Sequence, residues 1–383
     1  MSDLNIKDFL ACGAFLQTGA NLFKVLVGPF AAQDISQITD LKHPTLLYKP
    51  NFWDFLQRPL GKPLNLTQKS VYFSAKIYTL NREEFIHHLQ SFKPQAPNIR
   101  WKAPNEAQFK AQFEWSQKNF IEQKLLKTVP IIREQAEVKF TLENLAYCVL
   151  SLLQHKNFGW SYGYFENSVG MIGHTPEVLA HWTQIDRQLH TVALAGTRVQ
   201  SENAYTQILT DKKIRHEHQI VIEDINTKLK SLAFGLDFGG LNFNLKITQG
   251  ETDVLALTDL LHLMTEFQIE VDNIEQALAV IQALHPTSAM GLYPFSLDKL
   301  IEFSEFNLQK ERRTFAAPFA LIEENALYCV VAIRNLMFNK EHVQIFSGCG
   351  VTAESQYELE LTEAQNKRNS VKKMLGLFKA QHD

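Results

Sequence analysis

The stretch from Leu194 to Asp224 constrains the fold of this chain more than any other part of the sequence. It begins with the small-residue segment Leu194-Ala195-Gly196-Thr197-Arg198, which is typical of a tight turn that closes a strand. Ser201 can cap a helix that the pattern extends to about residue 233. That helix carries the adjacent polar pair Glu217-His218. A strand, a close turn and a long helix with a carboxylate must therefore meet at one place, and the rest of the chain is built around that corner.

The order of the predicted elements favours an α+β fold with large antiparallel sheets. Short strands with hairpin links stand beside long helices, without a regular β-α-β repeat. A doubly wound parallel fold would also need phosphate-binding glycines after an early strand, and the sequence has none there.

A polar segment at residues 91–105, marked by Pro94, Pro97 and Pro104, is the clearest internal boundary. We expect one large domain over residues 1–383. Within it, residues 1–104 carry no recognisable catalytic motif and residues 105–383 carry all the candidate motifs.

Periodicity places further elements. Apolar residues at near-helical spacing predict a helix over residues 105–127 that ends before Pro130, so Lys127 should lie at a helix-to-strand corner. Other predicted helices cover residues 142–154, 274–284 and 357–378. Alternating patterns predict strands at residues 70–75, 129–133, 188–194 and 241–249, and a hairpin of residues 327–338 and 342–346.

Composition excludes several classes of function. The formal charge of the 383 residues is −3, which gives no basic excess for nucleic acid or an anionic membrane. No run approaches the roughly 20 apolar residues of a membrane span, and the N-terminus lacks the positive region of a secretory signal. Four scattered cysteines fit reduced thiols. We expect a soluble cytoplasmic protein whose anion specificity comes from a few placed Arg and Lys residues.

Acidic side chains on two helices are candidates for a metal site. Glu360, Glu363 and Lys367 fall at i, i+3 and i+7 and share a helix face, directly after a strand that ends in Gly348 and Gly350. With Glu217 they could supply the oxygen ligands that Mg²⁺ prefers. Taken singly, each also fits a solvated helix face with an ordinary ion pair.

Three more charged residues stand in unusual surroundings. Arg334 lies within an apolar strand pattern, where it either pairs with an internal carboxylate or waits for an anionic ligand. Glu177 follows a Thr-Pro turn and Lys127 precedes a strand. Glu177 and Lys127 could each be either an exposed surface residue or a functional residue.

Taken in order, these segments resemble the chorismate-utilising enzymes, which include anthranilate, aminodeoxychorismate, isochorismate and salicylate synthases. The resemblance covers about two-thirds of the chain and implies two stacked, largely antiparallel sheets with flanking helices, an active site between them, chorismate as substrate and Mg²⁺ as cofactor. The matching pieces are His174-Thr175-Pro176-Glu177-Val178-Leu179, Leu194-Ala195-Gly196-Thr197-Arg198, Glu217-His218, His262-Leu263-Met264-Thr265, His285-Pro286-Thr287, Ile333-Arg334, Gly348-Cys349-Gly350-Val351 and Glu360-x-x-Glu363-x-x-x-Lys367.

The resemblance also implies roles for individual residues. Glu217, Glu360 and Glu363 resemble the Mg²⁺ carboxylates, Glu177 the general acid that protonates the departing C4 hydroxyl, and Lys127 the base of the water-using members. The expected substrate-binding residues are Ala195, Gly196, Thr197, His262, Arg334, Gly348, Gly350 and Lys367.

Two positions select among the reactions that the resemblance allows. Aminodeoxychorismate synthases carry a lysine where this chain has Ala195, and amine-using members commonly have glutamine where this chain has Lys127. The resemblance is therefore strongest to isochorismate synthase, an isomerase that feeds menaquinone or siderophore synthesis. It implies a monomer that needs no amidotransferase subunit. The alternatives are an anthranilate or aminodeoxychorismate synthase component, a salicylate synthase, and a non-catalytic carboxylate-binding relative.

The chain also departs from the family pattern. Ile214 stands where many members have a glutamate, one turn before Glu217. Near the expected pyruvyl-carboxylate pocket, Phe315 replaces a tyrosine, and Ala317 and Ala320 replace two glycines. Leu292 replaces a small residue after His285-Pro286-Thr287-Ser288. The chain is thus expected to be a divergent member.

Overall fold

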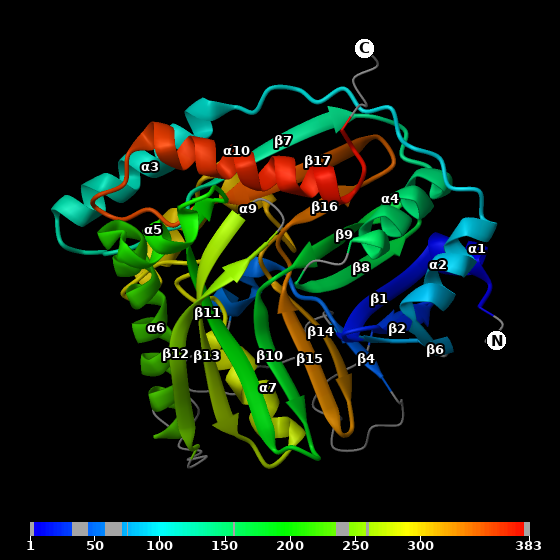
Figure 1. Cartoon of the computed structure of the whole chain (residues 1–383), viewed down its shortest axis with the longest axis horizontal. Coiled ribbons are helices and arrows are strands. Elements are labelled where there is room, and N and C mark those ends of the chain that lie inside the picture. Colours follow the sequence, from blue (N-terminus) through cyan, green and yellow to red (C-terminus); the bar gives the residue numbers. More distant parts are fainter. Residues whose placement is uncertain are drawn as a thin grey trace.

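The computed structural model describes residues 4–32, 45–57, 71–74, 76–155, 158–234, 245–257 and 260–378. Its strands form two antiparallel sheets, flanked by helices (Figure 1). The α+β prediction with two largely antiparallel sheets is therefore confirmed.

The first sheet has eight strands in the order β6-β2-β1-β8-β9-β16-β17-β7. Along the chain these strands are β1 (Cys12–Gly19), β2 (Leu22–Val27), β6 (Lys76–Asn81), β7 (Ile131–Glu137), β8 (Trp160–Glu166), β9 (Val169–Thr175), β16 (Asn335–Phe338) and β17 (His342–Gly348). Helices α1 (Ile6–Ala11), α2 (Arg82–Ser91), α4 (Leu142–Gln154) and α10 (Tyr357–Met374) contribute to an apolar cluster on one face of this sheet.

The second sheet has nine strands in the order β12-β13-β11-β10-β15-β14-β4-β5-β3. They are β3 (Ala31–Ala32), β4 (Leu46–Tyr48), β5 (Val71–Phe73), β10 (Val178–Thr183), β11 (Gln188–Val199), β12 (Ile247–Ala256), β13 (Leu260–Glu270), β14 (Pro318–Glu323) and β15 (Ala326–Val331). Helices α6 (Lys212–Ala233) and α7 (Ile274–Leu284) pack against this sheet and against each other.

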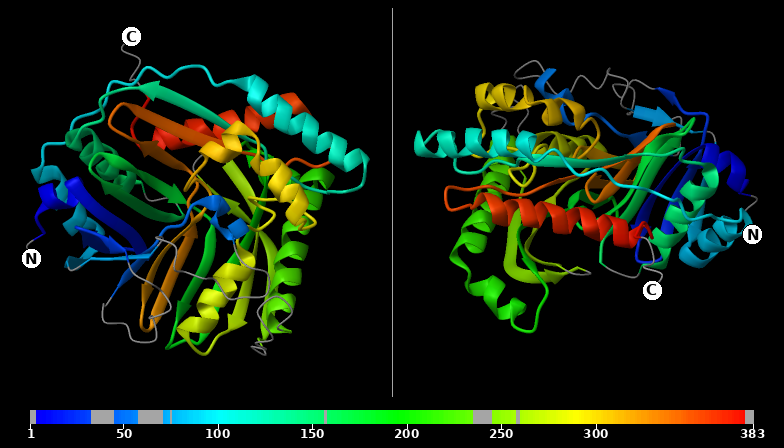
Figure 2. Two further views of the ribbon diagram at one scale, coloured as in Figure 1. Left: turned by 180° about the vertical axis from the view of Figure 1, so that it is seen from behind. Right: turned by 90° about the horizontal axis from the view of Figure 1, so that it is seen from above.

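The other helices in the described residues are α3 (Glu106–Ile121), α5 (Ala204–Thr210), α8 (Leu297–Ser304), α9 (Asn307–Glu311) and the 3₁₀ helix η2 (Phe52–Gln57). Two rings of α3 contact Tyr357 at the start of α10, and the view from above in Figure 2 shows these two helices running roughly parallel. The largest apolar cluster draws residues from both sheets, so the two sheets share one core.

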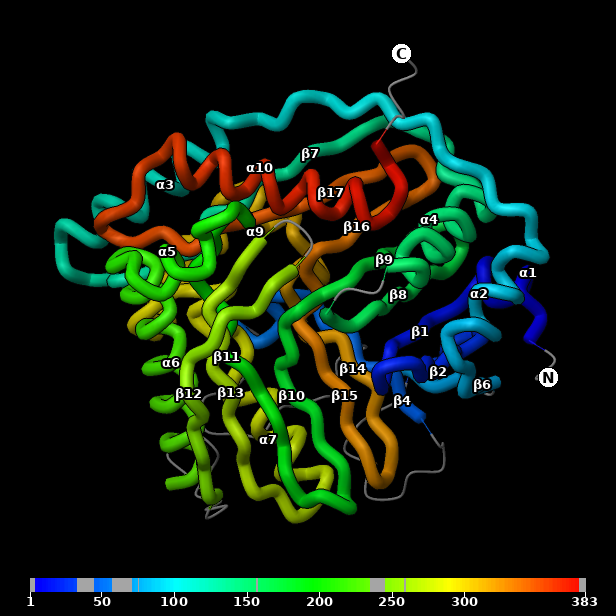
Figure 3. The backbone as a smooth tube through the Cα atoms, viewed as in Figure 1, coloured from blue at the N-terminus to red at the C-terminus, as the bar shows by residue number. Residues whose placement is uncertain are grey.

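Among the described strands the chain passes between the two sheets four times, after β2, β5, β9 and β15. Figure 3 follows the last two of these crossings. One joins β9 to β10 through Pro176 and Glu177, and the other joins β15 to β16 through residues 332–334. The predicted continuous strand over residues 327–338 is wrong for this reason. Arg334 has a positive φ of 54° and lies at the crossing rather than in mid-strand.

The corner at Leu194 to Asp224 is built differently from the prediction. The strand does not close at Leu194: β11 continues to Val199, and Gly196, with φ of 76°, makes a bulge in its pairing with β13. The single helix from Ser201 is also wrong. Extended backbone at Asp211 separates α5 from α6, and the Asp211 side chain caps α6 by accepting from the Ile214 amide.

Other boundaries differ by smaller amounts. The helix predicted over residues 105–127 ends at Ile121, because Gln123 takes a positive φ of 55°. The last helix ends at Met374, before Gly376 with φ of 66°. The helices over residues 142–154 and 274–284 are confirmed, whereas part of the strand at residues 241–249 lies outside the described residues.

Candidate active site

The crossings from β9 to β10 and from β15 to β16 are hydrogen-bonded to one another. The Val331 amide donates to the Glu177 carbonyl at 3.0 Å, and the His174 amide donates to the Arg334 carbonyl at 3.3 Å. Their side chains can therefore approach one place although 157 positions separate Glu177 and Arg334 in the sequence (334 − 177).

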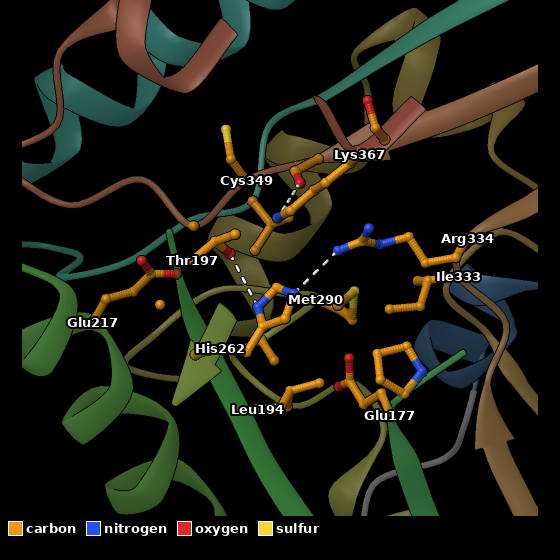
Figure 4. Close-up of a pocket in the computed structure, with 18 of the residues that line it drawn as sticks. Glu177, Leu194, Thr197, Glu217, His262, Met290, Ile333, Arg334, Cys349 and Lys367 are labelled. Carbon is orange, nitrogen blue, oxygen red and sulfur yellow. Dashed lines mark hydrogen bonds between the residues drawn. The ribbon is translucent and has the colours of Figure 1, made fainter. Parts of the chain in front are cut away.

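A pocket of about 670 Å³, which includes space open to solvent, lies at these crossings. The structure brings every predicted catalytic and substrate-binding residue to its wall, together with one predicted metal ligand: Lys127, Glu177, Ala195, Gly196, Thr197, Glu217, His262, Arg334, Gly348, Gly350 and Lys367. Figure 4 shows how several of these side chains converge from different elements.

One wall is a hydrogen-bonded chain of three side chains. Thr197 Oγ1 lies 3.2 Å from His262 Nδ1, and Arg334 Nη2 lies 3.4 Å from His262 Nε2 (Figure 4). Burial, and then the Arg334 charge, hold the pKa of His262 well below its ordinary value, so the ring is neutral. Burial lowers the pKa of Arg334 to about 10, which leaves it cationic at neutral pH.

Arg334 has no carboxylate within ion-pair distance among the described residues. Of the two interpretations that the sequence left open, the geometry favours the cation that awaits an anionic ligand. Lys367 is the second cation on this side, with Nζ 2.7 Å from Glu363 and 2.9 Å from the Gly348 carbonyl.

Gly350 allows the backbone to approach two functional side chains closely. A Cβ atom at this position would lie 1.9 Å from Glu217 Oε1 and 2.7 Å from Lys127 Cε. Any larger residue would have to displace one of them, so the glycine is needed for the close packing of α6 against the end of β17.

Lys127 is buried, with 1% of its surface exposed. Its Nζ donates to the Ser288 carbonyl at 2.7 Å and lies 3.7 Å from Glu217 Oε1. Burial lowers the pKa of Lys127, although the Glu217 carboxylate acts in the opposite direction. A buried amine that loses its proton more readily than usual can serve as a general base.

Glu177 is the complementary group, with 3% of its surface exposed. Burial raises its pKa from 4.5 to about 7, against the opposing effect of Lys127, Lys367 and Arg334. At neutral pH a large fraction of this carboxyl keeps its proton, as a general acid must.

The three predicted metal ligands come from two helices, but they are not equally placed. Glu217 lines the pocket, whereas Glu363 and Glu360 do not. Glu363 forms an ion pair with Lys367, and Glu360 forms one with Lys213. Burial, and then the Glu363 and Glu360 charges, raise the pKa of Glu217 to about 7 against the effect of Lys127. As the described side chains lie, no three His, Cys, Asp or Glu residues are grouped to hold a metal ion.

The departures from the family pattern are buried apolar positions. Ile214 packs against Gly196, where a Cβ atom would approach its Cγ2 to 2.6 Å. Phe315 lines the pocket and stacks on Phe346, with ring centroids 5.4 Å apart. Ala317 and Ala320 are fully buried.

Sequence reasoning missed the apolar part of the lining and two charged residues behind it. The pocket also contains Met290 and Phe346, while Leu194 and Ile333 line it beside the predicted Ala195 and Arg334. Met290 and Phe346 are ordinary apolar core residues by type, so the sequence held no signal that singled them out. The charged residues are Lys213, which is paired with Glu360, and Asp224, which lies behind Lys127.

Comparison with known families and proteins gives one consistent result. A family model described as chorismate binding enzyme matches residues 66–376. The salicylate biosynthesis isochorismate synthase of Pseudomonas aeruginosa is 27% identical over 212 residues, which cover 54% of this chain and 42% of that protein. The isochorismate synthase MenF of Haemophilus influenzae is 28% identical over 232 residues, covering 58% of this chain and 50% of that protein. The matches thus span half or less of these relatives' length.

Solved structures share the fold over nearly the whole chain. The Bacillus anthracis structure described as the 2,3-dihydroxybenzoate-specific isochorismate synthase DhbC has a TM-score of 0.72 at 17% identity, covering 97% of this chain and 99% of that one. The structure of MenF from Escherichia coli has a TM-score of 0.72 at 16% identity and covers 98% of this chain and 92% of that one. The structure of anthranilate synthase component I from Streptococcus pneumoniae has a TM-score of 0.65 at 15% identity and covers 88% of this chain and 81% of that one.

Proposed function

We propose that this chain, which belongs to the chorismate-binding enzyme family, is an isochorismate synthase. It would add water at C2 of chorismate and release the C4 hydroxyl. The observation that carries the proposal is the pairing of a buried amine with a lowered pKa, Lys127, and a buried carboxyl with a raised pKa, Glu177, in one pocket. Distant relatives named isochorismate synthase support this choice of reaction.

The reaction would proceed as a balanced displacement. The neutral amine of Lys127 takes a proton from water, and the water oxygen forms a bond to C2. Both ring double bonds shift, from C1–C2 to C1–C6 and from C5–C6 to C4–C5. The C4–oxygen bond breaks, and Glu177 donates its proton to the departing oxygen, which leaves as water. One water enters and one leaves, so the reaction is an isomerisation.

The substrate carboxylates would be held by the cations of the pocket. Arg334 can bind a carboxylate through two parallel hydrogen bonds, and Lys367 lies on the same side. Thr197 and His262 fix the direction of the Arg334 side chain, while Gly348 and Gly350 leave room for the ligand to approach the backbone. Ala195 leaves no lysine on β11 for a covalent adduct.

The donors of Glu217, Glu360 and Glu363 fit Mg²⁺ in chemical type, because a hard cation takes carboxylate oxygens. The Glu360 Oε2 atom is buried without a hydrogen-bond partner in the described residues, as a ligand oxygen awaiting a cation would be. When bound, Mg²⁺ would hold a substrate carboxylate and neutralise the crowded acidic charges. In the structure the Lys213 ammonium pairs with Glu360 and also acts on Glu217 and Glu363.

The Lys213 ammonium therefore supplies part of the positive charge that Mg²⁺ would bring, and it competes with the metal for Glu360. Lys213→Met is expected to tighten Mg²⁺ binding about tenfold, because a hydrogen bond to a charged group contributes about 1.5–3 kcal/mol and the metal would no longer have to displace it. It should also lower the melting temperature without Mg²⁺ and enlarge the rise on adding Mg²⁺. Calorimetric titration and thermal unfolding measure both quantities.

Lys212→Met, on the neighbouring exposed residue, is the matched control and should change neither quantity. Weaker Mg²⁺ binding by Lys213→Met would mean that the lysine orients Glu360 as a ligand rather than competing with the metal.

The proposed reaction is tested by incubating the protein with chorismate and Mg²⁺ and separating the products. Isochorismate is expected. Salicylate with pyruvate would indicate further elimination in the same pocket, and anthranilate or an aminodeoxychorismate on adding ammonia would indicate the amine-using class. Complete absence of turnover with retained chorismate binding would indicate a non-catalytic relative. We propose that the product feeds either menaquinone or siderophore synthesis.

A further inference from the structure

A buried carboxylate behind the pocket ties a loop to helix α6. Asp224 is 2% exposed and lies two helical turns after Glu217, on the same face of α6. Its Oδ2 accepts from the Ser288 amide at 2.6 Å and from Lys228 Nζ at 2.9 Å. Lys228 Nζ also donates to the Pro286 carbonyl at 2.5 Å. The Asp224 and Lys228 side chains thus fasten the loop at residues 286–288 to α6 at two points.

The other side of the same loop holds Lys127. Lys127 Nζ donates to the Ser288 carbonyl at 2.7 Å, which is the shortest polar contact of this ammonium among the described residues. The backbone of Lys127 is bonded to Tyr293 in both directions, at 3.1 and 2.9 Å. The amine is therefore located by the loop at residues 286–293, and the position of Ser288 within that loop depends on Asp224.

Ser288 contributes to this arrangement through its peptide groups. Its hydroxyl is buried and has no hydrogen-bond partner in the described part of the chain. The amide faces Asp224 and the carbonyl faces Lys127. Removing the hydroxyl should thus leave the connection intact, whereas removing the carboxylate should break it.

We propose that Asp224 is a positioning residue for Lys127: through the peptide groups of Ser288 it fixes where the amine lies above the substrate. The proposal rests on the proposed function, in which Lys127 activates water. A misplacement of about 1 Å in a catalytic group can cost about 10²-fold in rate, so this connection matters although Asp224 does not line the pocket.

The test compares three variants by steady-state kinetics. Asp224→Ala is expected to lower kcat about 10- to 100-fold, with KM changed less than about threefold. Asp224→Asn keeps an acceptor oxygen for the Ser288 amide and should be intermediate. Ser288→Ala is the matched control and should behave as the unmodified protein.

The inference is overturned if the loss in kcat equals the loss of folded protein, or if Ser288→Ala is as damaging as Asp224→Ala. A second measurement does not depend on turnover. The NMR signal of the labelled Lys127 side chain, identified by its loss in Lys127→Gln, is compared between the variants. A moved signal in Asp224→Ala with an unmoved one in Ser288→Ala supports the inference, and an unmoved signal in Asp224→Ala contradicts it, even if the unmodified protein makes no isochorismate and the proposed function fails.

Discussion

Glu177→Gln is expected to lower kcat for chorismate about 10²–10⁴-fold, the usual contribution of a general acid. Glutamine has nearly the same size and can still occupy the buried site at the crossing from β9 to β10, but it has no proton to give to the departing hydroxyl. KM should change little, because Arg334 and Lys367 remain to bind the substrate. Product formation at saturating chorismate, with and without the substitution, measures this loss.

The same substitution should stabilise the fold. Burial raises the pKa of Glu177 from 4.5 in an ordinary setting to about 7. Below pH 4.5 the carboxyl is protonated in both the folded and unfolded states and costs nothing. Between about 4.5 and 7 its ionisation increasingly favours the unfolded state, and above 7 the full cost, about 3 kcal/mol, is present.

Glutamine carries no such cost, so Glu177→Gln should be more stable than the unmodified protein at about pH 8, and the difference should vanish near pH 4.5. Chemical unfolding without Mg²⁺ at several pH values would reveal this trend. Glu266→Gln is the matched control, because that carboxyl is exposed on β13 and should affect neither activity nor stability. Full activity of Glu177→Gln would exclude Glu177 as the acid, and equal destabilisation at all pH values would contradict the buried-carboxyl argument.

The sequence predicted the site better than it predicted the boundaries of the elements around it. Glu177, Arg334 and Lys367 came from ordered motifs, and their convergence required only that the chain follow a family pattern. The boundaries failed where single backbone conformations decide them. The bulge at Gly196, the break at Asp211 and the crossing at Arg334 interrupt patterns that otherwise look continuous.

The roles of Asp224 and Lys213 could not be predicted from the sequence, because they depend on tertiary contacts. Asp224 has the spacing of an ordinary polar residue on an amphipathic helix, and only the approach of the loop after α7 makes it a partner of Ser288. Lys213 likewise resembles a surface lysine until α10 brings Glu360 to it. Periodicity shows which face of a helix is buried, but it does not show which other segment covers that face.

Lys127→Gln is the second substitution with a large expected effect. It removes the base and should lower water-dependent turnover about 10²–10⁴-fold. Glutamine retains a donor for the Ser288 carbonyl, so the loop should keep its place. Lys124→Gln is the matched control, because Lys124 is exposed and pairs only with Glu122 among the described residues.

The substitution should also reveal the link between Lys127 and the carboxylates. Burial raises the pKa of Glu217 and the Lys127 charge lowers it, with a net value of about 7. Lys127 donates to the Ser288 carbonyl and not to Glu217, whereas Lys213 donates to Glu360, so loss of Lys127 frees no ligand oxygen. Without Lys127, Glu217 should hold its proton to higher pH, and protonated carboxyls bind Mg²⁺ poorly. Mg²⁺ affinity of Lys127→Gln should therefore be weaker at pH 7 and recover at about pH 9, as titration calorimetry can measure.

These two effects separate the base from the metal site. If Lys127 is the base, turnover stays low even at a pH and Mg²⁺ concentration at which metal binding has recovered. If turnover recovers together with metal binding, Lys127 acts only through Glu217, and another group must activate the water. If Lys127→Gln leaves water-dependent turnover unchanged but the protein aminates chorismate when ammonia is supplied, the amine-using reaction replaces isochorismate synthesis as the function of this pocket.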